Sequence, residues 1–109
     1  RLAEMDFGCW EGQAWNAIAR TDIDAWTARF ADHRPGGGDS LAQMLERVNA
    51  ALQEVRAQPS DMLWISHAGV ARCVQWLRCD QGKQGQFPTA AQWPAQAPAP
   101  GHWTCYAPI

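Results

Sequence analysis

The sequence places a histidine in a turn where an anion could bind. Ser66-His67-Ala68-Gly69 follows the apolar residues 62–65 directly and leads into residues with helical spacing. An imidazole at that point would lie at the carboxyl end of a strand, where open α/β sheets bind ligands. N–H groups at a helix start and the positive end of the helix dipole favour anions, and Gly69 lets the backbone approach closely. His67 and Gly69 are therefore candidate phosphate-binding residues, while a turn histidine that hydrogen-bonds a carbonyl group is an equally good interpretation.

Glu4 is the second candidate, in a segment from Arg1 to Gly12 that mixes carboxylates with apolar residues and glycines. Such a segment could hold one carboxyl group in a partly apolar pocket, where a carboxylic acid can act as a general acid near neutral pH. Asp6 and Glu11 are better explained as solvated groups or as anions near a helix start. Composition alone does not decide whether Glu4 acts as an acid.

The elements that would position these residues follow from the apolar pattern. Helical spacing predicts short helices over 11–20 and 22–30, the second capped by Thr21 or Asp22, and a stronger helix over 41–55. Ser40 and Gln43 have the spacing of a capping box before that stronger helix. The residues between the two helix regions, 34–38, are rich in glycine and predict a loop.

The second half of the chain predicts a strand between two helices. Residues 62–66 form a short continuous apolar run, typical of a strand buried on both faces of a parallel sheet, and another helical face follows from 70 to 77. This succession predicts an α/β fold, namely a three-layer α/β/α sandwich with a mostly parallel sheet. The Gly/Pro-rich segment 80–102 is expected to be irregular, and residues 103–106 to form a short edge strand.

Composition limits the class of protein. A chain of 109 residues can form one domain at most, and its net charge of -2 gives no broad cationic face for nucleic acid. No apolar run approaches the roughly 20 residues that a membrane-spanning helix needs. The four cysteines form no C-x-x-C pair and follow no signal peptide, so we expect reduced thiols and a cytoplasmic location. A zinc hydrolase and a serine hydrolase are disfavoured, because neither metal-ligand spacing nor a Gly-x-Ser-x-Gly motif is present.

Three motifs, in this order and spacing, resemble the histidine phosphatase (phosphoglycerate mutase-like) superfamily. They are Arg1-Leu-x-Glu4-x-x-Phe7-Gly8-x-Trp10-Glu11-Gly12, Arg34-Pro-Gly-Gly-Gly-Asp39-Ser40 and Ser66-His67-Ala-Gly69-Val-x-Arg72. The resemblance extends from Arg1 to about Arg72. The Pro-rich tail that ends in Trp103 is similar to a branch of α-ribazole-phosphate phosphatases.

The resemblance implies a chemistry for these residues. In this superfamily the histidine of an Arg-His-Gly motif attacks phosphorus, two arginines and a second histidine hold the phosphoryl oxygens, and a carboxylic acid protonates the leaving oxygen. By motif, His67 resembles the second, phosphate-binding histidine, Glu4 resembles the proton donor, and the Gly69 amide belongs to the same pocket. The expected ligand is a small phosphorylated metabolite, with no metal or organic cofactor. Arg72 matches a family position but receives no catalytic role.

The departures from the family pattern suggest a fragment. No Arg-His-Gly occurs in the sequence, and His33 and His102 lack the required context of a strand that runs into a glycine turn. The resemblance places the nucleophile and an N-terminal strand upstream of Arg1. We therefore expect residues 1–109 to be a single partial domain whose sheet is incomplete, which is inactive alone and which self-associates through an exposed sheet edge. The alternative is a non-catalytic, truncated or degenerate relative that binds a phosphorylated ligand.

Two further expectations concern individual side chains. Asp39 is expected to cap the helix that follows it. Most of the seven tryptophans are expected in the core, Trp26 and Trp64 above all, whereas Trp10 and Trp15 could approach a substrate.

Overall fold

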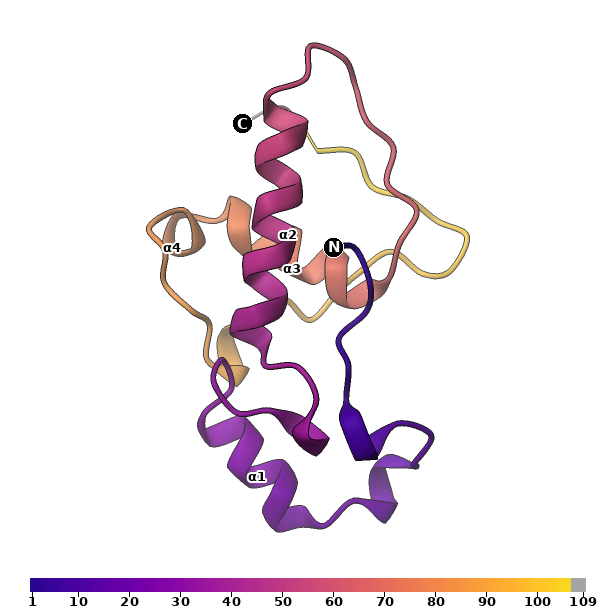
Figure 1. Ribbon diagram of the computed structural model, residues 1–109, viewed down its shortest axis with the longest axis vertical. Coiled ribbons are helices and arrows are strands. Elements are labelled where there is room, and N and C mark those ends of the chain that lie inside the picture. Colours follow the sequence, from indigo (N-terminus) through magenta and orange to yellow (C-terminus); the bar gives the residue numbers. More distant parts are fainter. Residues whose placement is uncertain (107–109) are drawn as a thin grey trace.

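The computed structural model describes residues 1–106 and consists of helices joined by long irregular segments (Figure 1). The α-helices are α1 (Arg20–Ala28), α2 (Leu41–Arg56), α3 (Ala68–Arg78) and α4 (Asp80–Lys83). Short 3₁₀ turns occur at Gly8–Trp10, Trp15–Ala17, Pro35–Gly37 and Ala90–Gln92. The molecule measures 47 × 31 × 20 Å, and α2 runs along its long axis.

Helix α2 is the central element, and it confirms the helix predicted over 41–55. Its apolar stripe is buried, and Val48 is fully inaccessible to solvent. The capping box is formed: the Ser40 hydroxyl accepts a hydrogen bond from the Gln43 amide at 3.2 Å, and the Gln43 side chain accepts one from the Ser40 amide at 2.9 Å. These bonds satisfy donors that have no partner inside the helix, and therefore fix where α2 begins.

The core lies between α2 and α3, and α3 confirms the helical face predicted over 70–77. Cys73 is fully buried, and Trp76 is 4% exposed with its indole N–H donating to the Gln86 carbonyl at 2.9 Å. Met5, from the N-terminal segment, completes this core. Because burial of a large apolar side chain contributes about 1.5–3 kcal/mol, Met5 anchors residues 1–6 against the two helices.

The predicted three-layer α/β/α sandwich is wrong, because residues 1–106 contain no strand and no sheet. The predicted strand 62–66 is an irregular segment in which Leu63 is 79% and Ile65 90% exposed. Residues 59–66 take part in no backbone–backbone hydrogen bond within the described chain. An apolar run becomes a strand only where a neighbouring strand pairs its N–H and C=O groups, and no neighbour does so here.

Several shorter elements also differ from prediction. Residues 11–20 hold only the 3₁₀ turn at Trp15–Ala17, because Ala14 and Ile18 adopt extended backbone conformations. Helix α1 begins at Arg20 without a side-chain cap, so neither Thr21 nor Asp22 caps it. The predicted edge strand at 103–106 is irregular. Segment 80–102 is mostly irregular, as predicted, apart from α4 and the 3₁₀ turn at Ala90–Gln92.

The N-terminal segment descends beside α2 and lies next to the residues that lead into α3 (Figure 1). Its first residue, Arg1, forms a two-pronged ion pair with Glu54 near the end of α2. The hydrogen bonds from the Arg1 guanidinium lower the pKa of the Glu54 carboxyl group below its ordinary value. Over residues 1–106, none of the helices has the length and apolar character needed to cross a bilayer.

Candidate functional site

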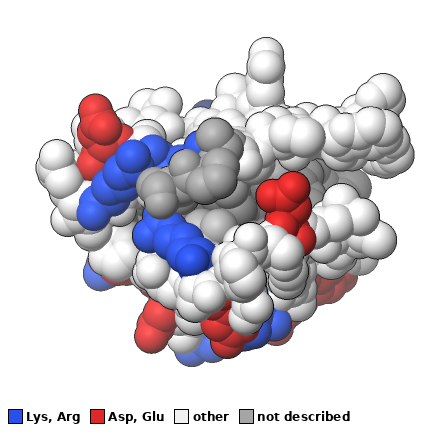
Figure 2. Space-filling model, turned by 90° about the horizontal axis from the view of Figure 1, so that it is seen from above, with Lys and Arg blue, Asp and Glu red and all other residues white. Residues whose placement is uncertain are grey.

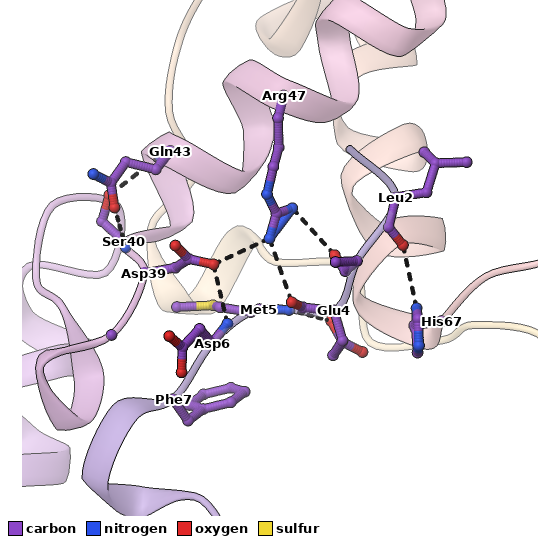
Figure 3. A network of polar contacts seen from close by, with 12 residues as sticks. Leu2, Glu4, Met5, Asp6, Phe7, Asp39, Ser40, Gln43, Arg47 and His67 are labelled. Carbon is purple, nitrogen blue, oxygen red and sulfur yellow. Dashed lines mark hydrogen bonds and ion pairs between the residues drawn. The ribbon is translucent and has the colours of Figure 1, made fainter.

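The structure brings Glu4 and His67 together at the start of α3, although they lie far apart in the sequence (Figure 3). The Gly69 amide donates a hydrogen bond to Glu4 Oε2 at 3.2 Å, and the Met5 amide donates to Glu4 Oε1 at 2.9 Å. His67 immediately precedes the helix, and its Nδ1 lies 3.2 Å from the Leu2 carbonyl oxygen. All three residues predicted for the site therefore belong to one cluster.

The group that lies at the start of α3 is the Glu4 carboxylate of the same chain. His67 has an extended backbone and makes no side-chain capping bond. The Glu4 carboxylate takes the place next to the first amides of α3, where a negative charge gains about 0.3–1 kcal/mol from the helix dipole. The Gly69 amide is thus paired with a carboxylate of the same chain.

Gly69 is needed for the close approach of Glu4. A Cβ atom at Gly69 would lie 2.1 Å from Glu4 Oε1, far inside van der Waals contact. The sequence motif suggested that glycine would permit an approach to the backbone, and here the approaching group is the glutamate carboxylate.

The turn before α3 is tied to the N-terminal segment by a second set of bonds. The Ser66 hydroxyl donates to the Leu2 carbonyl at 2.6 Å and lies 3.3 Å from His67 Nδ1. The same carbonyl therefore faces both the Ser66 hydroxyl and the His67 ring. A neutral His67 that uses Nδ1 as a donor to Leu2 would keep Nε2 free to accept, whereas a protonated His67 could donate from Nε2 to an anion.

Arg47 is a residue of this cluster that the sequence analysis missed. Its guanidinium donates to the Ala3 carbonyl at 3.1 Å, to the Glu4 carbonyl at 3.4 Å and to Asp39 Oδ2 at 3.1 Å (Figure 3). Arg47 therefore holds the backbone that carries the Glu4 side chain. Its position could have drawn attention to it, because it stands three residues after the buried Met44, at the edge of the apolar stripe, where a charged group needs partners.

Asp39 does not cap α2, so that prediction is wrong. Ser40 is the capping residue, and the Asp39 carboxylate turns back to accept hydrogen bonds from the Asp6 amide at 3.0 Å and from Arg47. The Asp39 amide also donates to the Asp6 carbonyl at 2.7 Å. Asp39 thus connects the glycine-rich loop to the N-terminal segment, a contact that no local pattern could reveal.

The titratable side chains of the site differ in their exposure to solvent. Glu4 and His67 are both exposed, so Glu4 does not lie in the apolar pocket expected from its neighbours. Below them Cys73 is buried, and this burial raises the pKa of its thiol to about 12, with a smaller lowering effect from Arg47 and a smaller raising effect from Glu4. Among residues 1–106 no three His, Cys, Asp or Glu side chains gather closely enough to hold a metal ion.

The site thus combines a carboxyl group and an imidazole at a helix start whose Gly69 amide binds the Glu4 carboxylate. Residues 1–92 match the histidine phosphatase superfamily, branch 1. The chain therefore belongs to the histidine phosphatase superfamily.

Similarity to a phosphatase from another organism supports this assignment. The chain is similar to the metal-independent phosphoserine phosphatase of Arabidopsis thaliana, with 29% identity over 86 residues. The aligned region covers 73% of this chain but only 36% of the relative, so the chain spans about a third of that protein's length. No solved structure matches the chain significantly.

Proposed function

We propose that this chain supplies the proton donor and the phosphate-binding histidine of a phosphomonoester hydrolase. The observation that supports the proposal best is the hydrogen bond between the Glu4 carboxylate and the Gly69 amide, next to His67. It puts an acid, an imidazole and a helix-start amide at one point on the surface, in a chain that belongs to a family of phosphatases.

The proposed roles follow from where charge develops during phosphoryl transfer. A phosphoryl group at the start of α3 would accept hydrogen bonds from the Gly69 amide and from a protonated His67, and these donors would stabilise its equatorial oxygens. A phosphate oxygen that took the place of the Glu4 carboxylate would displace that side chain outward. A protonated Glu4 would then donate its proton to the leaving oxygen as the ester P–O bond breaks.

The attacking group is proposed to be a histidine of the complete protein. The family forms a phosphohistidine and then hydrolyses it with water, and the motif that carries the attacking histidine is absent from these residues. We therefore propose that the 109-residue chain alone does not turn over. A non-catalytic relative that uses His67 and Gly69 only to bind a phosphorylated ligand is the competing proposal.

Two substrates are proposed on different grounds. The Pro-rich tail is similar to that of α-ribazole-phosphate phosphatases, which favours α-ribazole 5′-phosphate as the substrate. The named relative acts on phosphoserine, which makes phosphoserine the second candidate. A comparison of kcat/KM for both compounds distinguishes these proposals.

The first experiment compares p-nitrophenyl phosphate hydrolysis by the 109-residue chain and by a version extended upstream to the natural start codon. Activity of the extended version alone supports the proposal that Glu4 and His67 need an attacking histidine from outside these 109 residues. Activity of both means that another residue attacks phosphorus. Activity of neither favours the non-catalytic proposal.

The second experiment tests the role of Glu4 in the active form. Glu4→Gln should reduce turnover of alkyl phosphates at least tenfold more than turnover of p-nitrophenyl phosphate, because an activated leaving group needs little protonation. Equal losses on both substrates would remove the acid role. Glu46→Gln, at an exposed position of α2, is the matched control and should leave both rates unchanged.

A further inference from the structure

A cluster of aromatic side chains lies beside the N-terminal segment, separate from the Glu4 and His67 contacts. Phe7, Trp10 and Trp15 each pack against Trp26 of α1, with ring centroids 5.8, 5.9 and 6.4 Å away. Phe7 and Trp10 also meet Trp15 in edge-to-face contacts at 6.1 and 6.4 Å. These distances fall within the range of favourable aromatic pairs, so the rings support one another in fixed orientations.

Three of these rings surround a hollow of about 170 Å³. Its lining consists of Phe7, Trp10, Glu11, Gly12, Gln13, Trp15 and Ile18. Trp10 is 9% exposed and forms a buried wall, whereas Trp15 is 60% exposed and leaves the hollow open to solvent. More than half of the Trp15 side chain therefore stays exposed despite its contacts with the other rings, and a ligand in the hollow would bury it further.

Glu11 is the only charged residue in the lining. Its Oε1 accepts a hydrogen bond from the Phe7 amide at 3.0 Å, which keeps the carboxylate at the hollow, and Oε2 has no hydrogen-bond partner among the described residues. The faces of aromatic rings are electronegative, so the rings and the carboxylate favour the same sign of ligand. The lining contains no lysine or arginine to oppose a cation.

We propose that this hollow binds a small organic ammonium group, of the kind carried by choline. Aromatic side chains around a carboxylate suit a weakly hydrated cation, which gains from both the ring faces and the negative charge. A metal ion would need several oxygen ligands, and the lining offers one carboxylate. The inference goes beyond the proposed phosphatase activity and does not rest on it, since neither Glu4 nor His67 contributes to the hollow.

The first test is a calorimetric titration of the 109-residue chain with choline and with 3,3-dimethyl-1-butanol, in which carbon replaces the charged nitrogen. Choline should bind at least tenfold more tightly, which corresponds to about 1.4 kcal/mol. Equal affinities would mean that the hollow is merely apolar and would overturn the proposal. Absence of choline binding at millimolar concentrations would overturn it as well.

Two variants test whether binding occurs at these residues. Glu11→Gln keeps an oxygen acceptor for the Phe7 amide but removes the charge. It should therefore lower the affinity for choline about fivefold and leave the affinity for the neutral analogue unchanged. Trp15→Leu should weaken choline by a similar factor. The controls are Glu46→Gln and Trp103→Leu, which alter an exposed carboxylate and a 79% exposed indole outside the hollow.

The controls decide the interpretation. Losses in the site variants with unchanged affinity in the controls support the proposal. Equal affinities across all four variants would place choline elsewhere and overturn it. If circular dichroism shows that Trp15→Leu has not folded, Glu11→Gln decides alone, because its hydrogen bond to Phe7 is preserved.

Discussion

Arg47 and Asp39 form an ion pair of 3.1 Å in which both side chains are largely covered, at 24% and 30% exposure. Each partner also binds the N-terminal segment, Arg47 through the carbonyls of Ala3 and Glu4 and Asp39 through the Asp6 amide. The pair therefore holds the strip of backbone from which Glu4 reaches α3. This pair is partly removed from water. Loss of one partner should therefore lower the free energy of unfolding more than loss of a partner in a solvent-exposed ion pair.

The first prediction is that Arg47→Met lowers the free energy of unfolding by about 2 kcal/mol, since it leaves a half-buried Asp39 carboxylate without its cation. Urea unfolding measures this loss, and amide hydrogen exchange should show faster exchange at Asp6 and Gly69. The control is Arg20→Met, which removes an exposed ion pair with Asp24 on α1 and should cost less than about 0.5 kcal/mol. Similar losses in both variants would show that Arg47 has no special role.

The second prediction concerns Gly69 and Glu4. Gly69→Ala should expel the Glu4 carboxylate, because the new Cβ would lie 2.1 Å from Oε1. The lost hydrogen bond costs about 1–1.5 kcal/mol, and the better helix propensity of alanine returns up to about 1 kcal/mol. In a Glu4→Ala background nothing is expelled, so the same Gly69→Ala change should stabilise the protein. A double-mutant cycle by urea unfolding should therefore give a coupling of at least about 0.5 kcal/mol, and additive effects would contradict the contact.

The sequence predicted those parts of the fold that depend on local pattern. Helix α2 was predicted from its apolar stripe and from the Ser40–Gln43 capping box, and both are present in the structure. The run 62–66 failed as a strand because its pairing depends on a partner strand, which lies outside local pattern. A strand needs the backbone hydrogen bonds of another segment, whereas a helix forms most of its backbone hydrogen bonds internally.

The same distinction applies to the candidate site. Motif order selected Glu4, His67 and Gly69, and the structure brings them together, while their roles stay a prediction. It did not reveal Arg47, whose partners are backbone carbonyls about forty residues away in sequence. Backbone acceptors have no sequence signature, so a side chain that binds them is found only in the folded chain.

The third prediction concerns Cys73, whose thiol pKa is raised by burial from an ordinary 9.0 to about 12. The unfolded chain loses this proton first as pH rises, so the stability that the neutral thiol contributes is complete below about pH 9 and is lost between pH 9 and 12. The expected loss approaches about 1.4 kcal/mol per pH unit in that window. Urea unfolding at about pH 8 and about pH 10.5 measures it, on either side of the ordinary thiol pKa.

The control for that experiment is Cys73→Ala, which retains every other group that titrates in the same range. Its stability should fall less between the two pH values than that of the unchanged chain. A thiol reagent at about pH 8 should label the exposed Cys9 and Cys105 rapidly and label Cys73 only on unfolding. Parallel losses of stability with rapid labelling of Cys73 would contradict its burial.

The fourth prediction is that the chain self-associates, through residues 61–66 rather than through the sheet edge first expected. Met62, Leu63 and Ile65 are 55%, 79% and 90% exposed, and residues 59–66 offer unpaired backbone groups within the described chain. The loop after α2 forms the upper end of the molecule, and Figure 2 shows charged side chains scattered over a largely uncharged surface there. Exposed apolar side chains beside free N–H and C=O groups are the combination that pairs with a second copy.

Sedimentation velocity over a range of concentrations tests this self-association. The unchanged chain should sediment faster as concentration rises, and Leu63→Lys with Ile65→Lys should shift it toward monomer, because charges oppose apolar pairing. Phe87→Lys is the matched control, since it charges a 55% exposed aromatic residue in another part of the chain and should leave the association unchanged. A monomer at every concentration with a cooperative thermal transition would show that residues 61–66 remain exposed without a partner.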